Sequence, residues 1–329
     1  MNTTRKWNER TLRRLKLRDL RVLLAVAETG SMGKTAAQLA MSQPAVSKAI
    51  SEMERVVGMQ LLNRTAQGVE PTPHGRALLR WAVVVFDDLR QAVKELESLS
   101  DPGAGEIRIG TTDSMIAGFV PAVIDRFSRL YPKVVFEVLP AATFADQYAE
   151  LRERRIDLIL GRLATPAIGG ADLKSEVLFL DPMFPAAAVG SKWFRRRQIA
   201  LAELREARWC IPPDSSFVRP LINEAFREKG LEAPRHVVGS NSVQLSAALL
   251  ATGRFVGVLS GSTLRVSGKR LGLKRLLVDL PIRPLTTGIV TLKTRALSST
   301  VQLFIEHARE AARPYSKAPP WCNLGDPKC

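Results

Sequence analysis

The sequence predicts an α+β protein of several domains, in which an N-terminal helix-turn-helix unit and a long helix precede a larger α/β part. Three observations support this fold class. Three short segments before residue 58 carry apolar residues at helical spacing. In residues 75–99, apolar residues recur at alternating steps of four and three. From residue 106 onward, segments typical of strands and helices alternate, which favours a parallel sheet covered by helices.

Composition limits the classes of partner and of cellular location. The chain has 329 residues, 46% of them apolar, which is enough for two or three domains with cores of their own. Lys and Arg number 48 against 32 Asp and Glu, and a net charge of +16 favours a polyanion such as DNA, with an anionic membrane or simple solubility as alternatives. No run of about 18 apolar residues exists, and the N-terminal segment lacks the apolar core of a secretory signal. We therefore expect a cytoplasmic protein that does not bind membranes.

The N-terminal elements follow from caps and glycine stops. Residues 1–16 are basic without periodicity, and we expect a loose arm there. The first helix is predicted from Leu17 to Glu28, Ser31 can cap the second, and Ser42 can cap a third that ends at Gly58. Three short helices with tight connections form a helix-turn-helix pattern.

The third helix, which begins "SQPAVSKAI", raises a question about its exposed face. Its apolar residues lie on one side, and the opposite side carries only short hydrogen-bonding groups and one cation: Gln43, Ser47, Lys48 and Ser51. Such a face suits a helix that enters the DNA major groove and presents donors and acceptors near its N-terminal end. An exposed polar face with no partner is the alternative.

After Gly58, turn formers at Gly68, Pro71 and Pro73 predict a β-hairpin that carries Arg64. A long helix follows over residues 75–99, and its apolar residues form the seam of a two-stranded coiled coil. The predicted dimerisation residues are Leu78, Ala82, Val85, Leu89, Ala92, Leu96 and Leu99. Packing of this stripe inside one subunit is the alternative, but a stripe of this length favours a partner of matching length.

A linker at 100–105, "SDPGAG", separates this helix from the α/β part, and the Pro-rich tail 313–329 is predicted to be disordered. Enzyme chemistry is not indicated, because His74, His236 and His307 lie in unrelated contexts and no nucleophile or phosphate-loop motif occurs. The cysteines Cys210, Cys322 and Cys329 are too few and too scattered for disulfides or a metal site. We predict no catalytic residue, no metal and no cofactor.

A dense run of motifs resembles the N-terminal region of LysR-type transcriptional regulators: "AVAETGS", "TAAQLAMSQPAVSKAI", "MERVVGMQLLNRT" and "PTPHG". The resemblance implies a winged helix-turn-helix over 17–74, a dimerising linker helix over 75–99 and a periplasmic-binding-protein-like effector domain over 106–312. The effector domain would comprise lobe I, 106–180 with 284–312, and lobe II, 181–283. "VPAVIDRFSRLYP", "ELRERRIDLILGRL" and "LLATGRF" further resemble the subgroup that regulates genes of sugar-binding proteins, such as the galactose-binding protein regulator.

By this resemblance a set of residues on and near the third helix and the wing would contact DNA: Ser31, Gln43, Pro44, Ser47, Lys48, Ser51, Arg64 and Thr72. Lys48 stands where Arg is commoner in the family, and Lys cannot form the two-pronged hydrogen bond to guanine. Thr72 and Pro73 would close the wing and start the linker helix. For Arg64, an ion pair with Glu70 is the alternative.

Helix-start segments of the effector domain would point into a cleft between the lobes. The predicted effector-binding residues are Thr111, Thr112, Asp113, Ser114, Arg162, Ser215, Ser216, Arg219, Asn241, Ser242 and Ser260. Their alternative role is to cap helices only. A carboxylate at Asp113 would bind sugar hydroxyls or an amine and would repel an acid. The resemblance to the subgroup that regulates genes of sugar-binding proteins implies a sugar or sugar-derived effector. An effector with a carboxylate is the alternative, because Arg162 and Arg219 could bind it.

The predicted function is a sequence-specific DNA-binding transcriptional regulator controlled by a small-molecule effector. A homodimer or homotetramer would bind an interrupted inverted repeat in a promoter, and RNA polymerase is the further partner implied. A transport-associated solute-binding protein would share the two lobes but not the N-terminal helix-turn-helix. An architectural DNA-binding protein would not need a cleft-bearing domain of about two hundred residues.

Overall fold

The computed structural model describes residues 13–65, 68–101, 103–141, 143–164, 170–194, 196, 199–234 and 236–316. The chain divides between Ala92 and Val93 into two compact units. The predicted arm 1–16 falls mainly on residues 1–12, which lie outside the described residues.

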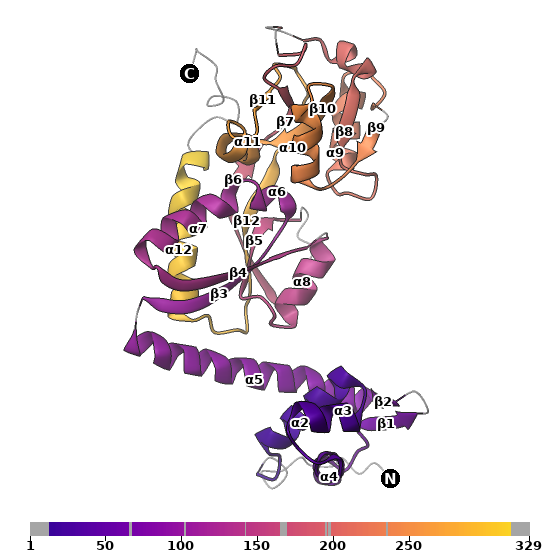
Figure 1. Ribbon diagram of the computed structural model, residues 1–329, viewed down its shortest axis with the longest axis vertical. Helices are drawn as coiled ribbons and strands as arrows, with labels where there is room; N and C mark the ends of the chain where they lie inside the picture. The colour runs from indigo at the N-terminus through magenta and orange to yellow at the C-terminus, as the bar shows by residue number, and fades with distance from the viewer. Residues whose placement is uncertain are drawn as a thin grey trace. The chain divides into compact units, whose positions relative to one another are not determined.

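The first unit is a three-helix bundle with a two-stranded wing (Figure 1). Its elements are α2 (Leu17–Thr29), α3 (Met32–Gln38), α4 (Gln43–Val57), β1 (Leu62–Thr65), β2 (Gly68–Pro71) and α5 (Pro73–Ser100), which continues into the second unit. Gly30 and Gly58 end α2 and α4 in the left-handed conformation that glycine adopts without steric cost. The apolar faces of the three short helices meet in one core.

Close backbone contacts hold the wing to this bundle. The N–H of Val69 donates to the carbonyl of Gly30 (2.9 Å), and a Cβ at Gly68 would lie 2.6 Å from the same oxygen. At the start of α5, a Cβ at Gly75 would lie only 2.0 Å from the carbonyl oxygen of Leu61. The "PTPHG" segment therefore requires a glycine, because backbone passes directly over backbone there.

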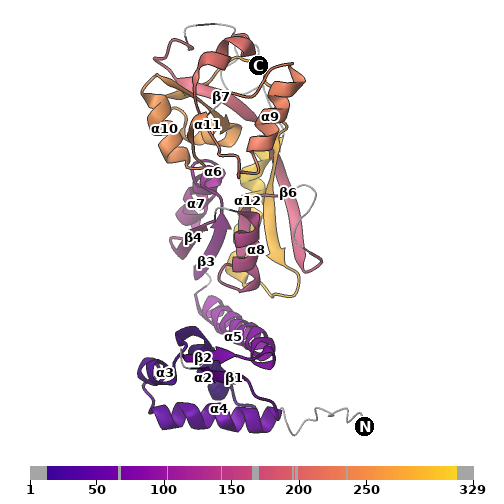
Figure 2. The ribbon, with the colours of Figure 1, turned by 90° about the vertical axis from the view of Figure 1, so that its right-hand side faces the viewer.

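In the second unit, the first of two sheets has the strand order β4-β3-β5-β12-β6. The bounds are β3 (Ala104–Thr111), β4 (Lys133–Pro140), β5 (Leu158–Arg162), β6 (Leu173–Asp181) and β12 (Leu285–Leu292). The first three run parallel, and β12 runs antiparallel to β5 and β6. Helices α7 (Phe119–Leu130) and α12 (Ser299–Ser316) cover one face and α8 (Phe144–Arg152) covers the other (Figures 1 and 2).

The second sheet has the order β11-β7-β10-β8-β9. Its strands are β7 (Met183–Ala188), β8 (Arg208–Ile211), β9 (His236–Gly239), β10 (Phe255–Ser260) and β11 (Leu273–Arg275). One face packs with η1 (Leu201–Glu206) and α9 (Arg219–Glu228), and the other with α10 (Val243–Ala251) and α11 (Gly261–Ser267). The chain crosses between the sheets twice, from β6 to β7 and from β11 to β12.

The predicted fold class is confirmed: a winged helix-turn-helix, a long helix and a two-lobed α/β part. Two predicted boundaries need correction. The long helix spans Pro73–Ser100, and β3 already begins at Ala104, within the expected linker. Helix α12 continues through Arg313 to Ser316, so the tail cannot begin at 313, and residues 317–329 lie outside the described residues. No helix in the described ranges is long and apolar enough to cross a membrane.

Candidate functional site

The N-terminal half of α4 presents an exposed polar surface. Ser42 caps the helix, its Oγ accepting from the N–H of Ala45 at 3.3 Å. Val46 and Ile50 are buried in the bundle, which turns the other side of the helix outward. The predicted residues on that side are exposed at Gln43, Pro44, Lys48 and Ser51, and half-buried at Ser47.

Arg64 joins this surface from the wing. Its Nη2 donates to Ser47 Oγ at 3.1 Å, so a guanidinium from β1 lies beside the N-terminal half of α4. The alternative ion pair with Glu70 does not form among the described contacts, and Glu70 lies opposite Asn63 in the wing register. Arg64 is exposed apart from this bond, which leaves most of its donors available to a partner.

Two other predicted DNA contacts have local structural roles. Ser31 is half-buried and caps α3, accepting from the N–H of Lys34 at 3.4 Å. Thr72 is only 7% exposed, and its hydroxyl both donates to the carbonyl of Gln60 (2.7 Å) and accepts from the N–H of Gly75 (3.0 Å). The prediction of a DNA contact by the Thr72 side chain is therefore wrong, because that side chain fastens the wing to the start of α5.

The predicted seam on α5 divides into two parts. Ala82 is 1% exposed and Leu78 is half-buried, and both pack into the core of the first unit, so these two predictions of dimer contacts need correction. Val85 is half-buried, and Leu89, Ala92 and Leu96 are exposed, whereas the side chain of Leu99 lies outside the described part. Sequence reasoning missed Trp81 and Val93, which are 67% and 54% exposed on the same helix. Residues 81, 85, 89, 93 and 96 are three or four positions apart and therefore form one stripe on the helix. This spacing in the sequence could have identified Trp81 and Val93.

Between the two lobes of the second unit lies a cavity of about 340 Å³. The predicted effector residues that line it are Thr112, Asp113, Ser114, Arg162, Ser215, Ser216, Asn241 and Ser260. They come from the first turn of α6 (Asp113–Ile116), the end of β5, the segment after β8, the start of α10 and the end of β10. Carboxyl ends of parallel strands from both sheets thus meet in one cleft.

Three predicted effector residues do not line this cavity. Thr111 is fully buried and donates to the carbonyl of Leu160 (2.7 Å), which joins two strands. Ser242 caps α10, accepting from the N–H of Leu245 at 3.3 Å. Arg219 is buried on α9, where it donates to the carbonyl of Pro234 and pairs with Asp214. Arg219 Nε and Nη1 make no hydrogen bond among the described residues, but none of the three side chains lines the cavity. The prediction of a ligand contact there is therefore corrected for all three.

The guanidinium of Arg162, which lines the cleft, is neutralised by Asp181. Arg162 is 1% exposed, and its Nη2 lies 2.7 Å from Asp181 Oδ2 while its Nη1 donates to Thr287 Oγ1 at 2.6 Å. Asp181 also accepts from the N–H and the hydroxyl of Ser262, at 2.9 and 2.5 Å. Arg162 Nε and Nη2 make no hydrogen bond among the described residues, although Nη2 is in the ion pair with Asp181.

Several lining residues were missed by sequence reasoning. Phe144 from α8 and Phe217 from the second lobe face each other across the cleft, with ring centroids 4.7 Å apart. Apolar and small residues make up most of the remainder: Ala141, Thr143, Met183, Cys210, Pro212, Val218, Ser240, Val243, Ser246, Val258, Leu259, Thr263 and Leu285. Burial raises the pKa of the Cys210 thiol, which lowers the fraction of the reactive thiolate form. No local pattern in the sequence marks these residues, because distant turns bring them together.

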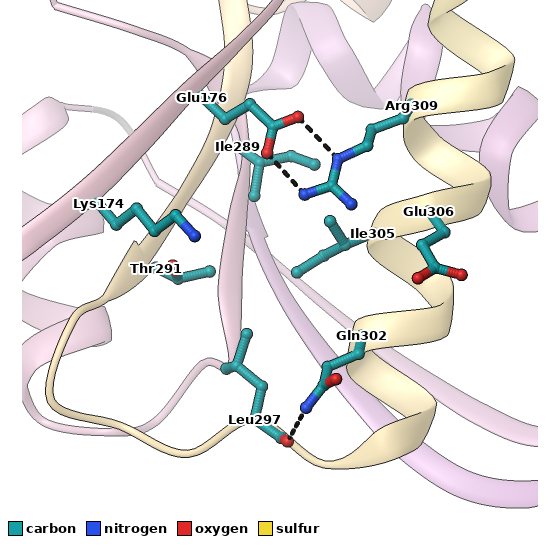
Figure 3. Close-up of a pocket in the computed structure, with 9 residues that line it drawn as sticks. All are labelled: Lys174, Glu176, Ile289, Thr291, Leu297, Gln302, Ile305, Glu306 and Arg309. Atoms are coloured by element: carbon teal, nitrogen blue, oxygen red, sulfur yellow. Dashed lines mark hydrogen bonds and ion pairs between the residues drawn. The ribbon is translucent and has the colours of Figure 1, made fainter.

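A second hollow, of about 290 Å³, lies between α12 and strands β6 and β12 (Figure 3). Two of its charged side chains pair with each other: Arg309 Nε and Nη2 donate to Glu176 Oε1 and Oε2 at 2.7 and 2.8 Å. The hollow is open, and we assign no ligand to it. Across the described parts of the chain, no group of His, Cys, Asp or Glu could hold a metal ion.

Two family matches cover most of the chain. Residues 17–76 match the bacterial regulatory helix-turn-helix protein family of lysR type, and residues 100–313 match the LysR substrate binding domain. This chain belongs to the LysR family. A LysR-type regulator binds DNA and carries an effector-binding domain, and its relatives are transcriptional regulators rather than enzymes.

Individual relatives agree with this assignment. The transcriptional regulator GbpR of Azospirillum brasilense is 30% identical over 254 residues, which cover 77% of this chain and 74% of the relative. GalR of Pseudomonas putida is 29% identical over 264 residues, 80% of this chain and 66% of the relative. These names are consistent with the subgroup that the sequence resembles. Full-length CbnR crystallised with its target DNA has the same fold, with a TM-score of 0.63 at 19% identity over 90% of this chain and 100% of that one.

Proposed function

We propose that this LysR-type regulator reads its operator with the N-terminal half of α4 and with Arg64 of the wing. The observation that supports this most is the Arg64–Ser47 hydrogen bond, which joins the wing cation to an otherwise free polar helix face. Gln43, Ser47 and Lys48 would reach base edges, and Arg64 would reach the adjacent backbone or minor groove. Pro44, Ser51 and Ser31 would lie at the margin of the contact.

The active form would be a homodimer or homotetramer in the cytoplasm that recruits RNA polymerase at a promoter. Two α4 helices related by a two-fold axis would read an interrupted inverted repeat. Because Lys and Arg contacts to phosphates release counterions, the affinity for any DNA should fall steeply with salt concentration.

The DNA proposal is tested by replacing Ser47 and Lys48 with Ala in the full chain. Affinity for the operator should approach that for scrambled DNA, a loss of at least about tenfold in discrimination, since one good base contact contributes about 1–3 kcal/mol. Binding to scrambled DNA at low salt should persist. Fluorescence anisotropy measures both, and K174A, which removes the same charge from the second unit, is the control. Unchanged discrimination would remove α4 from the proposal.

We further propose that the cleft between the lobes binds a sugar or a sugar-derived metabolite. Hydroxyl and amide groups line it together with two aromatic rings, the mixture that suits a polyol with one apolar face. Effector binding would change how the lobes sit, and through α5 how the DNA-binding units of an oligomer are spaced.

The effector proposal is tested by a thermal-shift screen of neutral sugars and small acids. We expect a sugar to raise the melting temperature of the full chain. T112A or N241A should lower the affinity for that sugar about tenfold or more through loss of a hydrogen bond, and a higher sugar concentration should then be needed for the same rise in melting temperature. T252A, a hydroxyl on the exposed end of α10 that bonds within its own turn, is the control. If only acids raise the melting temperature, the sugar class is excluded.

A further inference from the structure

Several hydrogen bonds connect the two lobes beside the cleft, among them those from Thr263 to the carbonyl of Ser114 and from Ser267 to the carbonyl of Ala117, and one further bond joins a carboxylate to a helix start. Asp113 is the first residue of α6, on the first lobe, and its Oδ2 accepts from the N–H of Val243 at 2.5 Å. Val243 is the first residue of α10, on the second lobe. Figures 1 and 2 both place α6 where the first lobe meets α10 and α11.

The N–H that Asp113 receives has no partner within its own helix. The first N–H groups of an α-helix are unpaired, and together with the helix dipole they attract a negative group. The nine-residue helix α10 therefore presents an anion-binding position at Val243, and both Val243 and Asp113 line the cavity. The carboxylate at that position is covalently part of the chain.

The guanidinium of Arg162, which lines the cavity, is likewise bound by a carboxylate of the protein. Asp181 neutralises Arg162 and also accepts two hydrogen bonds from Ser262. Both places in the cleft where an effector's carboxylate would be most favourable thus already hold a carboxylate of the protein. The lining that remains available is hydroxyl, amide and aromatic, together with Nε and Nη2 of the charge-paired Arg162, which make no hydrogen bond among the described residues.

We propose that Asp113 is a tethered ligand of α10: it bridges the lobes and occupies the anion position, so that the cleft accepts uncharged hydroxylated effectors and rejects carboxylates. The statement about effectors rests on the proposed effector cleft, whereas the bridge does not. An acid would have to displace Asp113 and would then lie beside its charge. A neutral polyol can bind with the bridge in place.

The bridge is tested by the hydrogen exchange of the Val243 amide in the full chain. In D113A this amide should exchange at least about tenfold faster than in the wild type, since its acceptor is gone. Acetate should slow the exchange again in D113A, because a free carboxylate can take the vacated position, and it should have no effect on the wild type. D125A, which removes an exposed carboxylate of α7 in the same lobe, is the control.

The outcomes separate the bridge from the effector proposal. Two results would overturn the proposal that Asp113 is a tethered ligand. One is a Val243 exchange rate in D113A equal to that of the wild type, and the other is an exchange rate in D113A that acetate does not lower. If D113A does not fold, D113N is measured instead, because it keeps a neutral acceptor. Its Val243 amide should exchange at an intermediate rate that acetate does not alter. A rate equal to that of the wild type would overturn the role of the charge.

Effector selection is tested with matched sugars. Each neutral hexose that raises the melting temperature is compared with its uronic acid, for example D-glucose with D-glucuronate. The wild type should bind the acid at least about tenfold more weakly than the sugar, and D113A should reduce or reverse that ratio. A wild type that prefers the acid would overturn the selection. If no sugar binds while the Val243 amide behaves as expected, the sugar effector fails and the bridge stands.

Discussion

At the scale of single residues, hydrogen-bond partners decide which polar groups of this regulator are free to meet a ligand or DNA. Thr111 and Thr112 are neighbours of the same type, yet the hydroxyl of Thr111 is held by a strand carbonyl while Thr112 lines the cleft. Ser42 and Ser47, at the start of α4 and within it, also have different partners. Ser42 caps the helix, and Ser47 accepts a hydrogen bond from Arg64 of the wing. Residue type therefore marks candidates, and contacts select among them.

Gly75 permits a residue-scale prediction. In G75A the new methyl group would meet the Leu61 carbonyl oxygen, which belongs to backbone and cannot rotate away. We expect a loss of about 2–4 kcal/mol in the free energy of unfolding of the first unit, measured by urea denaturation, because overpacking against backbone forces the chain to shift.

The control for this substitution is G33A. Gly33 lies in α3, and its nearest neighbour to an added Cβ, Gln43 Oε1, is 3.8 Å away. Alanine there should be neutral or should stabilise the unit by up to about 1 kcal/mol, as expected for a helical glycine with space around it. Equal effects of the two substitutions would contradict the close approach at Gly75.

At the scale of elements, α5 combines two roles along one helix. Its first turns pack into the bundle through Leu78 and Ala82, while the stripe from Trp81 to Leu96 leaves large apolar groups exposed. Large exposed apolar groups in a regular stripe indicate a partner surface. The first two members of the predicted heptad seam serve the core of the subunit, and a dimer contact by the remaining members stays a prediction.

We expect the chain to form an oligomer through α5. Asp substitutions at Leu89 and Leu96 should then give monomers, because two buried charges at an apolar interface cannot be compensated. Sedimentation velocity at several concentrations measures the change. E95D places Asp on the same helix outside the stripe and should leave the oligomer intact. A dimer that survives both Asp substitutions would show that α5 is not the interface.

At the scale of the whole molecule, a buried charge cluster joins distant segments of the first lobe. Asp157 accepts from the N–H and Nη2 of Arg108, both at 2.8 Å, and from Arg295 Nη2 at 2.8 Å. Burial by itself raises the pKa of Asp157, but the hydrogen bond and charge of Arg108 and the charge of Arg295 outweigh it, so this pKa lies below its usual value.

The sign of this shift predicts acid sensitivity. A carboxyl group with a lowered pKa in the folded state contributes stability above its unfolded pKa, near 3.9, and that stability is lost as the pH falls toward the folded pKa. The melting temperature of the wild type should therefore fall below about pH 4, whereas that of D157N should be lower throughout and should lose less in this range. At neutral pH, D157N should cost about 3–5 kcal/mol, since it removes the negative charge that pairs with the half-buried Arg108 and the buried Arg295.

The exposed pair of Asp125 and Arg129 supplies the comparison. D125N should cost at most about 1 kcal/mol and should not alter the acid transition, as is usual for surface ion pairs. If D157N followed the wild type through the whole pH range, the cluster would not be a source of acid sensitivity. Calorimetry of the three proteins between pH 3 and 7 decides between these outcomes.

The sequence by itself determined the order and kind of the elements, because periodicity, caps and glycine stops act between residues a few positions apart. It also indicated the polar face of α4, since the two sides of one helix can be read from spacing alone. Only the tertiary structure decided which polar groups stay available. The partner of Thr111 lies 49 residues away and that of Asp113 lies 130 residues away, across the two lobes. No local pattern carries such pairings, because they arise where separate parts of the chain fold back against each other.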